Sequence, residues 1–251
     1  MTTNVYDSNV GLVATDSRWS IQQGRWLVYV DDVPFYKIET LGQIAFMFAG
    51  KGRKIQEWKY WIRTEPADLS ARPSVDGISV CLVQMASKEV LFCEKQDIVK
   101  DGASFAGSGS RFAYMCWSVN RDARKSVESA KRLDPASGGD VKFLQFLDRA
   151  NNFAAVVAEA TIDMVDTALQ KRGMVMDLYE NRKGGAPFKL SDIAGATNPA
   201  VDEDLLSLHA KVVSGEASAE APCDGMYSDW TAEQEARLNS ALTLAFGWDK
   251  K

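Results

Sequence analysis

Histidine is almost absent from this sequence of 251 residues, in which His209 is the only one. A serine or cysteine hydrolase that uses a histidine base therefore has a single candidate, placed in an expected surface helix over residues 202–213. This disfavours a histidine-based catalytic triad and a metal site built from several histidines. We expect His209 to be an ordinary helix residue, and we expect no metal or cofactor.

The sequence also lacks the features of membrane, secreted and nucleic-acid-binding proteins. No apolar run approaches the roughly 20 residues of a membrane span, and no basic segment followed by an apolar stretch marks a secretory signal. The net charge is −5 and no dense basic patch occurs, which disfavours nucleic acid as a partner. The four cysteines show no CxxC spacing and are interpreted as reduced core thiols of a cytoplasmic protein, although two could lie on neighbouring strands. They are Cys81, Cys93, Cys116 and Cys223, with Cys81 and Cys93 as the possible neighbours.

The first eighteen residues carry the pattern around which the chain is organised. Apolar and β-branched runs over residues 1–6 and 10–15 flank a polar turn, which predicts a β-hairpin. Its second strand brings Asp16-Ser17-Arg18 back to the start of the chain. If Met1 is removed, Thr2 carries a hydroxyl and a free α-amine on one residue, a nucleophile with a built-in base.

The remaining elements come in blocks of strands and helices, without the alternation of βαβ units. This order predicts an antiparallel, layered α+β fold without internal repeats. For residues 153–169 the pattern fits either a strand followed by a helix or one long helix. Strands are expected at 26–30, 35–39, 44–49, 78–85, 89–94, 103–106 and 141–147, and helices at 53–63, 111–120 and 122–133.

The composition changes at residue 184, where Gly, Pro, Ser, Ala and Asp become more frequent. Residues 214–222 are the most linker-like part of this region. A final helix is expected from Thr231, which forms a capping-box pattern with Gln234. We therefore divide the chain into a domain of residues 1–183 and a C-terminal extension of residues 184–251.

Several short motifs lie at junctions between the expected elements. Taken singly, each has an ordinary explanation as a turn, a solvated lysine, a helix cap with an anion nest, or a bend. Their order resembles that of the catalytic β subunits of the proteasome and of HslV-type peptidases, which are N-terminal-nucleophile (Ntn) hydrolases. The resemblance runs from Thr2 to about Leu147. It rests on Thr2-Thr3, Ala14-Thr15-Asp16-Ser17-Arg18, Lys37, Ala49-Gly50, Gly107-Ser108-Gly109 and Asp134-Pro135-Ala136-Ser137-Gly138-Gly139.

The resemblance implies a fold and a mechanism. The fold would be a four-layer αββα sandwich of antiparallel sheets, here with a helical C-terminal extension. Thr2 would attack a carbonyl carbon, and its own α-amine would accept the proton. Lys37, held by Asp16, would stabilise the developing alkoxide, and the backbone N–H of Gly50 would bind the oxyanion.

The resemblance also implies roles for the surrounding residues. Ser108, Asp134 and Ser137 would form a network around the Thr2 amine. Ser20 would pair with an extended peptide by β-augmentation, together with the glycine that ends the apolar strand, Gly50. Phe48 would lie at the primary pocket and make it restricted or apolar.

This chain departs from the family pattern in four ways, one of which is a single clear helix between Gly50 and Ile78 where the family typically has two. The separation of Thr2 and Asp16 (16 − 2 = 14) is two residues shorter than usual, an even change that keeps each side chain on its original face. About a hundred residues follow Leu147, more than the family tail. Only Met1 precedes Thr2, and the Thr2 nitrogen is an amide, not a base, while Met1 is attached.

Two functions follow from these observations. The first is a threonine peptidase or amidohydrolase acting on peptide or protein substrates, assembled as a homo-oligomeric ring or stack, with an ATPase partner left open. The second is a catalytically silent relative that serves as a binding or immunity-type partner through its extension. A phosphate-binding protein built on Gly107-Ser108-Gly109 lacks the P-loop lysine spacing and is the poorest reading.

Overall fold

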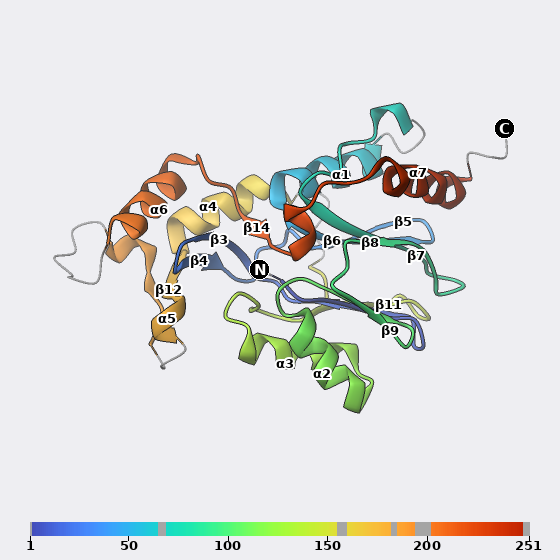
Figure 1. Ribbon diagram of the computed structural model, residues 1–251, viewed down its shortest axis with the longest axis horizontal. Helices are drawn as coiled ribbons and strands as arrows, with labels where there is room; N and C mark the ends of the chain where they lie inside the picture. Colours follow the sequence, from blue (N-terminus) through green and yellow to red (C-terminus); the bar gives the residue numbers. More distant parts are fainter. Residues whose placement is uncertain (1, 65–68, 155–159, 182–184, 194–201, 248–251) are drawn as a thin grey trace.

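Two antiparallel sheets form the centre of the molecule (Figure 1). The computed structural model describes residues 2–64, 69–154, 160–181, 185–193 and 202–247. The smaller sheet has five strands in the order β11-β2-β1-β10-β9. They are β1 (Asn4–Asp7), β2 (Leu12–Thr15), β9 (Ile98–Lys100), β10 (Ala103–Ala106) and β11 (Lys142–Gln145).

The larger sheet has nine strands, with the order β13-β12-β4-β3-β14-β6-β7-β8 and β5 paired to β6. Its central strand β6 is apolar on both faces because both are covered. Phe46 and Phe48 pack on the helix side, whereas Ala45 and Met47 pack toward the smaller sheet. The strands are β3 (Trp19–Gln23), β4 (Trp26–Val30), β5 (Ile38–Leu41), β6 (Ile44–Lys51), β7 (Ile78–Gln84), β8 (Glu89–Glu94), β12 (Met174–Asp177), β13 (Phe188–Lys189) and β14 (Glu220–Ala221).

Helices cover the outer faces of both sheets (Figure 1). Helices α2 and α3 pack on the smaller sheet, while α1, α4, α6 and α7 contact strands of the larger one. The helices are α1 (Gly52–Thr64), α2 (Ser110–Asn120), α3 (Ala123–Leu133), α4 (Ile162–Arg172), α5 (Leu178–Asn181), α6 (Glu203–Ser214) and α7 (Ala232–Phe246). Short 3₁₀ turns are η1 (Leu69–Ala71), η2 (Leu190–Asp192) and η3 (Asp224–Tyr227).

Most predicted elements are confirmed. The N-terminal hairpin pairs Asn4 with Thr15 and Asp7 with Leu12. The final helix begins after Thr231 with both halves of the predicted capping box formed. The thiols of Cys81 and Cys93 are free, and these residues pair across β7 and β8. In the open segment 153–169, the helix that both alternatives share begins at Ile162. Residues 155–159, on which the choice between a strand and a longer helix depends, lie outside the described part.

Two expectations about strands are wrong. The return strand expected at 35–39 begins three residues later and spans Ile38–Leu41, where it pairs with β6. Lys37 joins this pairing only through its carbonyl, which accepts the Phe48 N–H at 2.8 Å. The linker-like interpretation of residues 214–222 is also wrong, since Glu220–Ala221 forms β14 inside the larger sheet. Strands β3, β9, β12, β13 and β14 are additions to the predicted set.

The region after residue 184 contributes to the same sheet as the rest of the chain. The expected domain boundary falls between β12 and β13, which pair with each other. His209 is half-buried in α6, as expected for a helix residue. Across the residues that the structure describes, no helix is long and apolar enough to cross a membrane.

Lys59 on α1 is a buried cation away from the site. Its Nζ donates to the Tyr36 carbonyl at 2.6 Å and lies 3.5 Å from Glu39 Oε2. Burial lowers the pKa of Lys59 to about 8, against the opposing effect of Glu39. Between about pH 8 and pH 10.5, the pKa of Lys59 in the unfolded chain, the folded state has released a proton that the unfolded state still holds. The free energy of unfolding therefore rises with pH in this range.

We expect Lys59→Met to remove this contribution. The free energy of unfolding in urea, measured at pH 7.5 and 9.5, should increase with pH by about 2 kcal/mol more in the parent than in the variant. The difference isolates Lys59, because all other titrating groups are common to both proteins. An identical pH dependence in the two proteins would contradict the prediction.

Candidate active site

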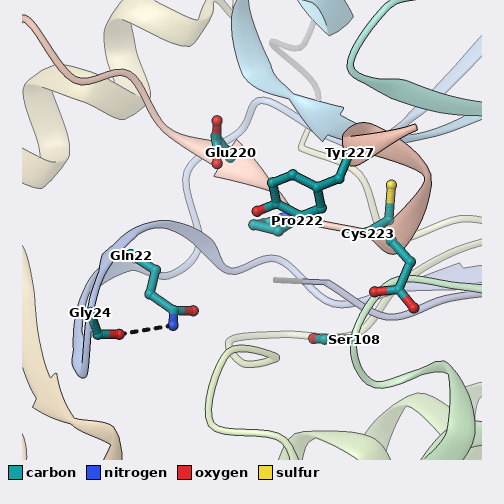
Figure 2. Close-up of a pocket in the computed structure, with 8 residues that line it drawn as sticks. Gln22, Gly24, Ser108, Glu220, Pro222, Cys223 and Tyr227 are labelled. Atoms are coloured by element: carbon teal, nitrogen blue, oxygen red, sulfur yellow. Dashed lines mark hydrogen bonds between the residues drawn. The ribbon is translucent and has the colours of Figure 1, made fainter. Parts of the chain in front are cut away.

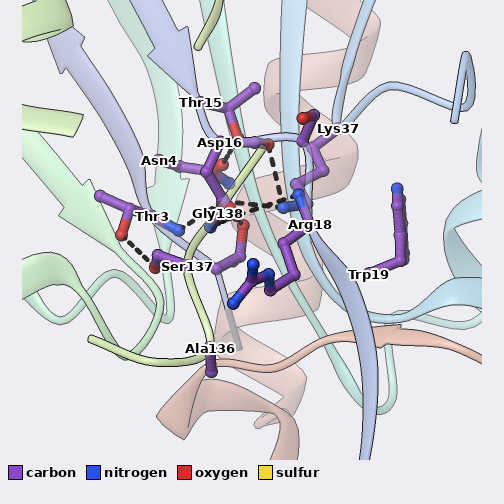
Figure 3. Close-up of polar contacts among 12 residues, drawn as sticks. Thr3, Asn4, Thr15, Asp16, Arg18, Trp19, Lys37, Ala136, Ser137 and Gly138 are labelled. Atoms are coloured by element: carbon purple, nitrogen blue, oxygen red, sulfur yellow. Dashed lines mark hydrogen bonds and ion pairs between the residues drawn. The ribbon is translucent and has the colours of Figure 1, made fainter. Parts of the chain in front are cut away.

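The carboxylate of Asp16 is the centre of the candidate site (Figure 3). Its Oδ1 accepts the Thr2 hydroxyl at 2.6 Å and the Lys37 ammonium at 2.8 Å. Thr2 and Asp16 have 0% and 1% exposed surface, and Lys37 has 1%. The remaining donors are backbone N–H groups, namely Thr3 to Oδ1 at 2.8 Å, and Arg18 and Gly138 to Oδ2 at 3.1 Å each.

Local structure explains why these groups meet. The pairing of Asn4 with Thr15 places the residues before β1 beside those after β2. The backbone N–H of Asp16 donates to the Thr3 carbonyl at 3.2 Å, which extends this pairing by one step. Lys37 directly precedes β5, and its ammonium also reaches the Asp16 carbonyl at 3.0 Å. The predicted candidates Thr2, Asp16 and Lys37 are thus brought together.

Burial and pairing act in opposite directions on the two charges. Burial of Asp16 favours its neutral form, but Lys37 and the hydrogen bonds from Thr2 and Thr3 outweigh this and lower its pKa. Burial also lowers the pKa of Lys37, although Asp16 opposes this shift. The carboxylate therefore stays ionised, and the lysine releases its proton more readily than an exposed lysine would.

A second cluster forms around Asp134. Its Oδ2 accepts the hydroxyls of Ser108 at 2.5 Å and Ser137 at 2.7 Å. The Ser137 hydroxyl also lies 2.7 Å from Thr3 Oγ1. The structure therefore brings Ser108, Asp134 and Ser137 together as expected. Among the described residues, the hydrogen bonds of this cluster reach β1 at Thr3 rather than at Thr2.

Arg18 ties the two clusters together, a role that was not predicted from the sequence. Its guanidinium forms a bidentate pair with Asp31 at 2.8 Å and donates to the Pro135 carbonyl at 2.6 Å. It also stacks 3.6 Å from the centre of the Tyr29 ring. A Cβ at Gly138 would lie 2.3 Å from this guanidinium, so the glycine allows the close approach. The Asp-Ser-Arg triplet was a signal for Arg18, whereas nothing marked its partner Asp31.

Gly50 is the next-to-last residue of β6. Its φ of +120° favours glycine, and a Cβ there would lie 2.3 Å from the Gly77 carbonyl oxygen. It pairs with Ala221 of β14, and Ser20 pairs with Glu220 of the same strand. The two residues expected to hold an extended peptide thus flank β14. Their roles toward a substrate stay predictions.

Phe48 is fully buried on the helix side of the larger sheet. Its ring packs against Phe46 and Trp58 with centroid distances of 6.2 Å to each. A substrate would reach this ring only after the surrounding side chains had moved. Its role in a primary pocket stays a prediction.

A cavity of about 360 Å³ opens beside the Asp134 cluster (Figure 2). Ser108 lines one side, and the C-terminal extension lines the other through Glu220, Pro222, Cys223, Asp224 and Tyr227. Gln22 and Gly24 of the β3–β4 turn complete the lining. Glu220 carried no sequence signal, because it lies in the segment that was interpreted as a linker. Among the described residues, no three His, Cys, Asp or Glu side chains are grouped as a metal site.

Comparisons with known proteins found similarity to solved structures only. No family model matches the sequence, and no curated protein matches it. Part of the chain is similar to Thiobacillus denitrificans BPH, solved in complex with epoxomicin, with 16% identity and a TM-score of 0.39 over 57% of this chain and 97% of that chain. Part is also similar to eukaryotic HslV from Trypanosoma brucei, with 18% identity and a TM-score of 0.34 over 57% of this chain and 99% of that chain.

Proposed function

We propose that this chain is a proteasome-like threonine amidohydrolase of the peptidase class, with a four-layer αββα Ntn fold, that uses Thr2 after Met1 is removed. One observation carries the proposal: the Thr2 hydroxyl and the Lys37 ammonium share one oxygen of a fully buried carboxylate. Buried charged groups beside a nucleophilic hydroxyl are typical of functional sites, because each group is costly to desolvate.

The reaction has two halves. In the first, Thr2 Oγ forms a bond to the carbonyl carbon of an amide and its proton passes to the Thr2 α-amine. The C–N bond then breaks, the leaving amine takes that proton, and an ester remains on Thr2. In the second half, water adds to the ester carbon and the acid leaves, which restores the Thr2 hydroxyl.

Lys37 and Asp16 act on the charge that develops at Thr2 Oγ. The ammonium stabilises the developing alkoxide, and Asp16 holds that ammonium in place through its 2.8 Å contact. The cluster of Ser108, Asp134 and Ser137 holds the loop before α2 and the loop before β11 against the start of β1. We assign it to positioning of the Thr2 backbone, and we assign the oxyanion contact to Gly50.

The test is the intact mass of the purified protein, read together with its activity. We expect the loss of one methionine and hydrolysis of acyl-amide coumarin substrates. Protein with a free Thr2 α-amine can also be prepared with a cleavable leader, whose removal by a protease makes Thr2 the first residue. The matched control retains one glycine before Thr2 and should be slower by about 10²-fold or more, because its nitrogen is an amide. Equal activity of the two forms would exclude the α-amine as the base.

Self-association is the second part of this proposal. The outer face of α2 exposes Met115 and Val119, which lie one helical turn apart and have 58% and 86% of their surface accessible. Burial of such apolar side chains between copies would favour a ring or a stack. Light scattering coupled to size exclusion measures the mass in solution, and we expect Val119→Asp to lower it. A monomeric parent would overturn this part alone.

A further inference from the structure

Strand β14 fills a gap between two strands that border the candidate site. Glu220 pairs with Ser20 of β3 on one side and with Lys51 of β6 on the other, and Ala221 pairs with Gly50. Since neighbouring strands lie about 4.8 Å apart, β3 and β6 are separated by room for one extended chain. The gap lies beside Thr2, because Asp16-Ser17-Arg18 leads directly into β3.

The strand is anchored at its start by α4 and α1. Asp166 accepts the Ser218 hydroxyl and the Ala219 N–H, both at 2.8 Å. The Gly52 N–H donates to the Ala219 carbonyl at 3.2 Å, and a Cβ at Gly52 would lie 2.3 Å from that oxygen. Ala219 and Ala221 are fully buried in the main hydrophobic core. These hydrogen bonds and core contacts therefore hold the segment in a defined position in the fold.

The chain is fixed again after β14. The Trp230 indole N–H donates to the Ile78 carbonyl at 3.2 Å, and its ring stacks on Phe92. The Lys95 ammonium bonds the Ser228 hydroxyl and the Asp229 carbonyl, both at 2.7 Å. With contacts on both sides, the segment leaves no free strand edge between β3 and β6. Addition of a substrate strand needs such an edge.

The open space lies on the other face of β14. Alternation along the strand buries Ala219 and Ala221 in the main core and places Glu220 on the opposite face, where it lines the 360 Å³ cavity with Ser108. This volume is near the lower end of small-molecule sites. The charged side chains among the described lining residues are Glu220 and Asp224, and none is Lys or Arg.

We infer that β14 occupies the place of an extended substrate strand, and that the site instead accepts a short amide whose acyl part carries a positively charged amine facing Glu220. The inference about the amide rests on the proposed function. The inference about β14 rests only on its pairing and anchors. A negatively lined cavity disfavours acidic acyl groups and favours cationic ones.

The first experiment compares three coumarin amides with the free-Thr2 protein: alanyl amide, its N-acetyl derivative, and an N-acetylated tetrapeptide amide. We expect hydrolysis of the alanyl amide, a kcat/KM about ten-fold lower for the N-acetyl derivative, and no turnover of the tetrapeptide. Turnover of the tetrapeptide at the rate of the alanyl amide or faster would overturn the inference.

The role of Glu220 is tested by Glu220→Gln. We expect KM for the alanyl amide to rise about ten-fold, with no change for the N-acetyl derivative. Glu216→Gln is the matched control, because Glu216 is an exposed residue of the same segment that lines no described part of this cavity. An equal effect of Glu220→Gln on both substrates would show that Glu220 does not recognise the substrate amine.

The strand itself is tested without catalysis, in protein carrying Thr2→Ala. A fluorescent N-acetylated tetrapeptide should not bind, and should bind after Asp166→Ala, which releases Ser218 and Ala219 and should raise hydrogen exchange at residues 219–221. Asp163→Ala is the matched control, since Asp163 is on the same helix, 70% exposed, with one ion pair at 3.7 Å to Arg53. Gly52→Ala displaces the same carbonyl if Asp166→Ala does not fold.

These outcomes separate the two proposals. If no amide is hydrolysed but the tetrapeptide binds only after the anchor is removed, the proposed function fails and the placement of β14 holds. If the tetrapeptide binds equally well with the anchor intact, the inference about β14 is overturned whatever the activity.

Discussion

Thr2→Ala is expected to fold like the parent and to lose hydrolysis by about 10³-fold or more, since it removes the atom that bonds to the substrate. The fold should tolerate the change because Asp16 Oδ1 keeps two of its donors, the Thr3 N–H and the Lys37 ammonium. The lost hydrogen bond should cost about 1 kcal/mol of stability.

The measurement is the initial rate on the alanyl amide, together with urea unfolding of both proteins. Thr2→Ser is the control, because it keeps the hydroxyl and should keep a measurable rate and an ester adduct detectable by mass. A Thr2→Ala protein that is as active as the parent would remove Thr2 from the mechanism.

The second large effect is expected from separating Asp16 and Lys37. Asp16→Asn leaves a buried ammonium without its counter-ion, and Lys37→Met leaves a buried carboxylate without one. Each single change should cost about 3–5 kcal/mol of stability, because an uncompensated charge remains in the interior. Each should also nearly abolish hydrolysis, since the stabilising cation is lost or displaced.

The double variant Asp16→Asn/Lys37→Met is the decisive comparison. It contains neither charge, so it should be more stable than the sum of the two single losses predicts, while activity stays absent. Urea unfolding of the four proteins at pH 7 gives the coupling energy. Strictly additive losses would show that the 2.8 Å contact contributes little.

The same pair predicts a dependence on acid. The pKa of Asp16 is lowered in the folded state, so its stabilisation is present above the unfolded value of 3.8 and is lost as pH falls through the lower folded value. The parent should therefore lose stability below about pH 4 more steeply than the double variant. Equal slopes in acid urea titrations would contradict this assignment.

Local sequence patterns predicted the elements that have their own periodicity or punctuation. The hairpin of β1 and β2, the buried strand β6 and the capping box of α7 are each encoded within a few neighbouring residues. Strand β14 has two residues and no periodicity, and it is defined by pairing with Ser20 and Lys51, far away in the sequence. Alternation along a strand cannot reveal such a partner.

The candidate site likewise contains residues that the sequence could predict and residues that it could not. Asp16 and Lys37 were identified through the order of the motifs that resembles the Ntn hydrolases, because each motif taken singly has an ordinary explanation, whereas Thr2 was also marked by its place one residue from the start of the chain. Gly138 and Thr3 contribute only backbone N–H groups to Asp16, and every residue but proline has that group. Glu220 reaches the cavity through a strand that was predicted as a linker.

The position of β14 also bears on the order of events during synthesis. The larger sheet is joined across β3, β14 and β6 only after residue 221 has left the ribosome, about 10–40 s after residue 1 at ordinary rates of elongation. Contacts between residues so distant in the chain form late in folding. On the proposed function, an aminopeptidase that removes Met1 would therefore act on an open N-terminus during translation, before completion of the sheet closes the region in which Thr2 becomes buried.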